Sequence, residues 1–110
     1  MVEELNGMST KGVSRKGDSL STGHGCAGST VLATPGQGTV YANGILVARV
    51  TDLTVSHAFP PSPPCAPHVA PVNVGAPNVW AVGKQVARIG DSVDAGSMTG
   101  GSETVFAGNA

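Results

Sequence analysis

The chain has 110 residues, a formal net charge of −1 at pH 7 and few charged residues (12%). This length holds one domain, the charge balance argues against a nucleic-acid partner, and no apolar run reaches the ~20 residues of a membrane-spanning helix. Sixteen glycines, eight prolines and frequent valines predict an all-β chain of short strands joined by many turns. A thin core of this kind needs another source of stability, such as a metal, a disulfide or a large partner.

The sequence repeats itself from residue 12 onward, so we expect residues 1–11 to be an N-terminal lead and residues 12–110 to be the domain. The pattern Gly-x-x-(Thr/Asn)-Val-aromatic-Ala occurs at 36–42, 75–81 and 101–107. The pattern Arg-x-x-Asp occurs at 15–18, 49–52 and 88–91. The first Arg-x-x-Asp has no glycine pattern before it, and the last glycine pattern has no Arg-x-x-Asp after it. We therefore expect the two ends of the chain to complete a third unit.

Each complete unit is predicted to be a β-hairpin. In the first, Val40–Ala42 is a strand, Asn43-Gly44 is the dipeptide that favours a type I′ turn, and Ile45–Val50 is the return strand. Residues 79–89 follow the same plan. Together with the unit formed by the two ends, these hairpins predict pseudo-threefold symmetry about one axis.

The loops that follow the first two Arg-x-x-Asp patterns contain every histidine and cysteine of the chain. The second loop is stiffened by four prolines between His57 and Cys65, because proline fixes φ and is excluded from helices and central strands. Three histidines (His24, His57 and His68) and one thiolate make a tetrahedral set that suits zinc. Cys65 lies in the loop that carries two of these histidines, and Cys26 is the alternative thiolate.

A disulfide between Cys26 and Cys65 is the other alternative for the two cysteines. We disfavour it, because the sequence begins without the signal peptide that would indicate an oxidising compartment. The expectation is therefore two reduced thiols, of which one binds the metal.

The repeats resemble those of the PAAR-repeat proteins, the tips of type VI secretion spikes and of some contractile phage tails. The resemblance covers about residues 12–108 and rests on Gly75–Trp80 and Ala87–Asp91, and more loosely on Gly36–Tyr41 and Ala48–Asp52. The proline and alanine that give the family its name are replaced in both return strands, and Thr51 stands where the family has a glycine. These replacements are compatible with a return strand, because its alternation of side chains is kept.

The resemblance implies a small conical domain of three pseudo-threefold β-hairpin repeats with one structural zinc near the apex. Its ligands would be His24, His57, Cys65 and His68. It also implies a non-enzymatic tip that caps and sharpens a trimeric β-helical spike, VgrG-like or a phage central spike, in a 1:3 chain ratio. Such a tip serves membrane puncture by a contractile injection machine, touches the target membrane transiently, and in some members attaches effector or adaptor proteins.

The resemblance also implies where the protein acts. The tip would assemble in the cytoplasm and reach the extracellular space or the target cell envelope on firing, or it would sit at the tail tip of a virion. A bacterial secretion system and a phage tail both remain open as the parent machine.

Six apolar strand residues are expected either in the core or on the spike-facing base, for which they are the candidates: Val40, Tyr41, Val79, Trp80, Val105 and Phe106. For Tyr41 and Trp80 we expect packing in the core rather than at the interface. The repeated arginines and aspartates are expected to form intramolecular pairs that fix the turns.

Two other functions were weighed against the spike tip. A zinc-dependent hydrolase needs an open coordination position and a general base, whereas four ligands close the expected site and the loop from His57 to His68 has no Asp or Glu. A secreted effector needs a further domain, and we expect the segments outside the repeats to be too short for one.

Overall fold

The computed structural model describes residues 10–60 and 65–109, and within these residues every regular element is a short strand. The expected lead therefore lies outside the described residues up to Ser9. The strands are β1 (Thr10–Gly12), β2 (Ser19–Ser21), β3 (Ser29–Val31), β4 (Tyr41–Ala42), β5 (Ile45–Leu46), β6 (His57–Phe59), β7 (Ala66–His68), β8 (Trp80–Ala81), β9 (Lys84–Gln85), β10 (Ser92–Val93), β11 (Gly96–Met98) and β12 (Phe106–Asn109). The all-β prediction is confirmed. The described part of the chain has no helix long and apolar enough to cross a membrane.

Two of the expected hairpins form within the chain and the third joins its two ends. β4 pairs with β5 and β8 pairs with β9, each in antiparallel register. β12 pairs with β1 in the same way, with Phe106 opposite Gly12 where the first hairpin has Tyr41 opposite Leu46. The two ends of the chain thus complete the third unit, as the incomplete repeats predicted.

The turns of the two internal hairpins have the backbone conformation that a type I′ turn requires. Asn43 and Gly44 have φ values of 57° and 77°, and Val82 and Gly83 have values of 49° and 81°. Positive φ is costly for a β-branched residue such as valine. The repeat imposes the turn on Val82 although its side chain opposes it.

The three units are joined by a closed ring of backbone hydrogen bonds around the pseudo-threefold axis. Ser14 N–H donates to Ala87 O (2.9 Å), Ala87 N–H donates to Ala48 O (2.9 Å), and Ala48 N–H donates to Ser14 O (3.0 Å). All three residues have 0% of their surface exposed. Only small side chains fit where three strands meet this closely.

Each ring residue is followed by an arginine whose partner is the aspartate three residues later. The Asp Oδ2 accepts the backbone N–H of the arginine in all three units, at 2.7–2.9 Å. The guanidinium groups of Arg15 and Arg88 also lie 2.9 Å from their aspartates, and that of Arg49 lies 3.5 Å from Asp52. The repeated pairs are therefore intramolecular, as expected, and each closes a tight turn beside the ring.

The small core is split into two clusters, and the second one includes the ring residues Ala48 and Ala87. The cluster near the hairpins consists of Val13, Ala42, Val47, Ala76, Ala81, Val86 and Ala107. The second consists of Leu20, Leu32, Ala48, Val72, Ala87, Val93 and Met98. Neither cluster contains an aromatic residue.

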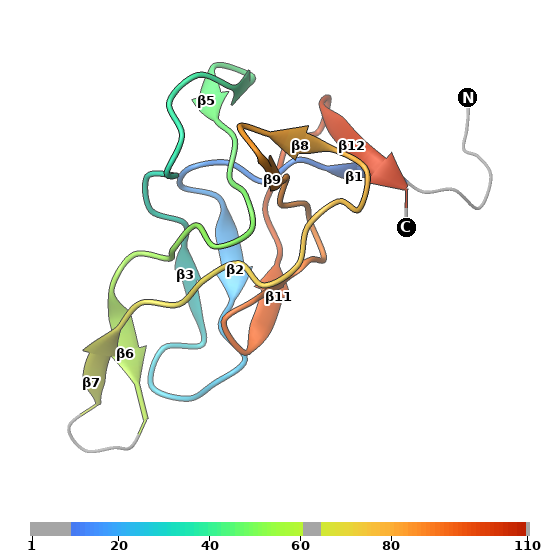
Figure 1. The fold of residues 1–110 in the computed structure, drawn as a ribbon. Coiled ribbons are helices and arrows are strands. Elements are labelled where there is room, and N and C mark those ends of the chain that lie inside the picture. Colours follow the sequence, from blue (N-terminus) through green and yellow to red (C-terminus); the bar gives the residue numbers. More distant parts are fainter. Residues whose placement is uncertain (1–9, 61–64, 110) are drawn as a thin grey trace.

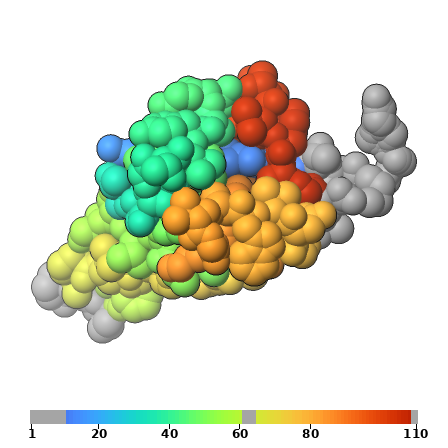
Figure 2. Space-filling view, turned by 45° about the horizontal axis from the view of Figure 1, so that its top comes forward, coloured from blue at the N-terminus to red at the C-terminus, as the bar shows by residue number. Residues whose placement is uncertain are grey.

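The fold has a broad end and a narrow end. β5, β8 with β9, and β12 with β1 gather at the broad end, and the β6–β7 hairpin lies at the opposite end (Figure 1). In the space-filling view the three hairpin regions appear as separate lobes, coloured green, orange and red, around a common centre (Figure 2). We call the face made by these three hairpins the base, and the end that carries β6 and β7 the apex.

Thr51 is expected to be the strained member of three equivalent turn positions. It has a φ of 80°, close to those of its counterparts Gly17 (82°) and Gly90 (91°). Thr51→Gly should raise the free energy of unfolding by about 0.5–1 kcal/mol in urea denaturation. The reason is that relief of a left-handed conformation, about 1–2 kcal/mol, exceeds the added chain entropy of glycine, about 0.5–1 kcal/mol.

Gly17→Ala is the matched reverse change and should destabilise by about 1 kcal/mol. A Cβ at Gly17 meets no atom within 4 Å, so the change reports on the backbone alone. An unchanged or lower stability for Thr51→Gly would contradict the assignment of strain.

Candidate metal centre and base

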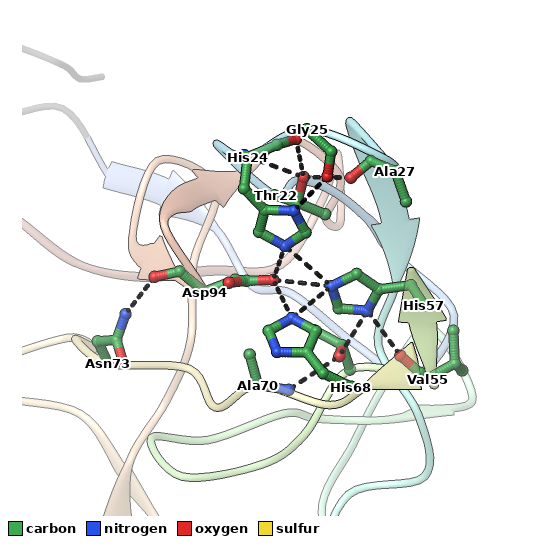
Figure 3. A network of polar contacts seen from close by, with 11 residues as sticks. Thr22, His24, Gly25, Ala27, Val55, His57, His68, Ala70, Asn73 and Asp94 are labelled. Carbon is green, nitrogen blue, oxygen red and sulfur yellow. Dashed lines mark hydrogen bonds and ion pairs between the residues drawn. The ribbon is translucent and has the colours of Figure 1, made fainter. Parts of the chain in front are cut away.

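The three loops at the apex each bring a ligand-type side chain to one point. His24 follows β2, His57 and His68 lie on β6 and β7, and Asp94 begins the turn between β10 and β11. His57 and His68 are directly opposite in the register of their hairpin, so their side chains share one face. Figure 3 shows the three imidazole rings around the Asp94 carboxylate.

The four donor atoms are close enough to surround one ion. The Oδ2 of Asp94 lies 2.9 Å from Nε2 of His24, 2.8 Å from that of His57 and 3.2 Å from that of His68. Nε2 of His57 lies 3.2 Å from that of His24 and 2.9 Å from that of His68. Zinc bonds of ~2.0–2.1 Å place tetrahedral donors roughly 3.3 Å apart. The five separations given above are slightly shorter than that spacing, and all four donor atoms lie within 4.8 Å of one another.

Hydrogen bonds at the far side of two rings turn their Nε2 atoms toward the centre. Nδ1 of His57 donates to Val55 O (2.9 Å), and Nδ1 of His24 donates to Gly25 O (2.9 Å). In a neutral ring this leaves the lone pair on Nε2, as metal-binding histidines require. Two such lone pairs facing each other at 3.2 Å repel unless a cation lies between them. The residues present therefore fit a bound metal ion.

The carboxylate at the centre is held in its charged form. Burial alone would raise the pKa of Asp94, but hydrogen bonds with His24, His57 and His68 outweigh it and lower that pKa. The pKa of His24 is raised, first by its bond to the Gly25 carbonyl and then, against the opposing effect of burial, by Asp94. A divalent cation among the four donors would likewise hold the Asp94 carboxylate in its charged form.

The structure differs from the expected ligand set at Cys65. Its sulfur is bonded to that of Cys26, with 6.2 Å between the Cα atoms, so the expectation of two reduced thiols is wrong for this structure. Cys65 stands three residues before His68, about 10 Å along an extended chain and on the opposite face of it. The Cys65 sulfur is engaged with Cys26, and Asp94 is the fourth ligand-type residue beside the three histidines.

Asp94 was missed by the sequence analysis, although the repeats carried a signal for it. His24 lies six residues after Asp18, His57 five after Asp52, and Asp94 three after Asp91. Asp94 is the ligand-type residue that the third loop offers at the equivalent place. The missing step was to require one donor from each unit.

The candidate spike-binding residues come together at the base. Tyr41, Trp80 and Phe106 are 56%, 61% and 52% exposed, which contradicts the expected core packing of Tyr41 and Trp80. In each hairpin the aromatic residue faces outward and the following alanine faces inward. The valines that precede them, Val40, Val79 and Val105, are exposed or half-buried beside the aromatic residues.

Comparison with known families gives one finding. A family model described as PAAR motif matches residues 16–98, which is most of the described chain. No curated protein matches the chain.

Metal analysis of ligand variants can decide between Asp94 and Cys65 as the fourth ligand. We expect about one equivalent of zinc in protein prepared without added metal, and a loss of affinity of about tenfold or more in Asp94→Asn, which removes the charge with little change of shape. His57→Ala should lose the metal altogether. Elemental analysis and competition with a chelator measure both.

The double variant Cys26→Ser/Cys65→Ser is the matched control and should keep its zinc. It should nevertheless unfold more easily, by about 2–4 kcal/mol, because the disulfide closes a loop across a sequence separation of 39. Loss of zinc from the single variant Cys65→Ser together with full retention in Asp94→Asn would restore the thiolate as the fourth ligand.

Proposed function

The chain belongs to the PAAR family of spike-tip proteins, found in type VI secretion systems and contractile phage tails, and we propose that it caps the end of a trimeric β-helical spike. The observation that carries this proposal is the base. Three pseudo-equivalent hairpins surround one axis there, and each presents an exposed aromatic side chain: Tyr41, Trp80 and Phe106.

The pseudo-threefold symmetry explains how one copy of this chain can bind three subunits of a spike. The end of a trimeric β-helix has three equivalent open strand edges, and such edges aggregate unless they are covered. A single chain with three related hairpins can offer each edge a similar strand and a similar aromatic contact. Exposed aromatic residues clustered at the centre of a face are typical of the residues that dominate interface energies.

The proposed metal serves the other end of the molecule. A zinc ion held by His24, His57, His68 and Asp94 would tie the three apical loops together at one point. Four protein donors close a tetrahedral site and leave no position for a substrate, which favours a structural role over the hydrolase alternative. The tip is therefore proposed to be non-enzymatic, assembled in the cytoplasm and carried out through the target envelope.

Native mass spectrometry with a fragment of a trimeric spike protein from the same source tests the proposal. We expect one copy of this chain on three copies of the spike. Trp80→Asp should weaken binding by about tenfold or more without loss of folding, because Trp80 is an exposed residue on the base.

Leu53→Asp supplies the matched control for that variant. Leu53 is likewise exposed (44%) and apolar, but it lies outside the three hairpins of the base. Binding should survive this change. A 1:1 or 3:3 assembly, or equal effects of the two variants, would overturn the cap.

A further inference from the structure

The base is hollow at its centre. A cavity of about 160 Å³ opens there, and its lining comes from all three hairpins. The lining residues are Val13, Val40, Tyr41, Ala42, Val47, Val79, Trp80, Ala81, Val86, Val105, Phe106 and Ala107. They form four sets of three equivalent residues, so the cavity lies on the pseudo-threefold axis.

The repeated sequence itself creates this hollow. The residue after each aromatic is an alanine, and Ala42, Ala81 and Ala107 are all buried, at 2–4% exposure. The floor is made by Val13, Val47 and Val86, each 4% exposed. A larger side chain at the three alanine positions would fill the space, as close packing of protein interiors normally demands. The same small residue instead occurs in every unit.

The chemistry of the lining restricts what can enter. Every lining residue is apolar or aromatic, and the one side-chain hydroxyl, that of Tyr41, donates to Gly38 O at 3.3 Å. Among the described residues, no charged side chain borders the cavity. A polar occupant would lose its hydrogen bonds to water without replacement, whereas an apolar one gains by leaving water.

We propose that this axial cavity receives the ends of three identical aliphatic side chains, one from each subunit of the spike. The inference rests on the proposed function, because it takes the base as the spike-binding face. A homotrimer places the same residue of each subunit around its axis, and a cavity with threefold-related walls accepts such a set equally from each direction. The volume is close to that of the ~150 Å³ apolar cavities that hold one benzene molecule, so three branched methyl ends fit better than three aromatic rings.

The cavity then fixes the register of the two proteins. Flat apolar contact at the rim allows the tip to slide or rotate on the spike, while a plug on the axis centres it. Contacts at the desolvated centre of an interface commonly carry its largest contributions. We therefore expect the cavity to matter more for affinity than any single aromatic residue on the rim.

Ala81→Leu tests the inference from the side of this chain, since it fills the hollow without adding charge. Binding of the spike fragment should fall by roughly 30-fold or more in calorimetric titration. Ala33→Leu is the control, because it adds the same side chain outside the base, where Ala33 N–H bonds to Leu53 O, and it should bind as the wild type does. Truncation to alanine of the aliphatic residue nearest the spike's axis should cause a similar loss.

Xenon supplies a second measurement that needs no spike and no folded variant. Under xenon pressure the methyl resonances of Val13, Val47 and Val86 in the free wild-type chain should shift together, because xenon binds in apolar cavities of this size. Absence of these shifts would overturn the inference. Equal affinity of the wild-type chain and of folded Ala81→Leu for the spike would also overturn it. If the wild-type chain binds no trimeric spike, the proposed function is wrong. The xenon experiment then still shows whether the apolar cavity exists.

Discussion

The ring of three backbone hydrogen bonds between Ser14, Ala48 and Ala87 is the constraint on which the rest of the structure depends. Each member donates to one neighbour and accepts from the other, so the ring closes only when all three units are in place. The third unit's member is Ser14, which follows β1, and β12 completes the hairpin of that unit by pairing with β1. The tight approach also forbids large side chains at the axis, and it leaves the protein with two small core clusters instead of one.

A fold built on such a ring has two ends with different requirements. At the base the hairpins splay around the axis, and the alanines that follow the aromatic residues leave a hollow where a core would otherwise continue. At the apex the connecting loops are unequal in length, so the symmetry of the backbone is lost. What persists there is one donor from each loop, His24, His57 and Asp94, joined by His68 from the hairpin that carries His57. At the narrow end, contacts among these four ligand-type side chains hold the loops together in place of a large hydrophobic core.

The hairpins and their symmetry could be read from the sequence because the signals are local and repeated, as in Asn43-Gly44 and the Arg-x-x-Asp patterns. The exposure of Trp80 could not, because a strand of two residues has no alternation from which to infer its buried face. The place of Asp94 in the site could not be predicted either, because it depends on where three loops converge and not on a local sequence pattern. The pairing of Cys26 with Cys65 likewise depends on the path of two loops and not on spacing.

The hydrogen bonds of the three repeated arginines depart from the pseudo-symmetry. Nη1 of Arg15 donates to the Asn43 side chain (3.1 Å), and Nη1 of Arg49 donates to Val82 O (2.9 Å), so each reaches from the ring to a hairpin turn. Nη1 of Arg88 and Nε of Arg49 are buried and have no partner within the described part of the chain. The hairpin beside Arg88 is the one formed by β12 and β1, where the other two units have a continuous turn. A buried donor left unpaired costs free energy, so Arg49 and Arg88 each carry a cost at the ring that the less buried Arg15 does not. A partner that covers all three hairpins of the base at once, as proposed above, would stabilise the base together with the ring.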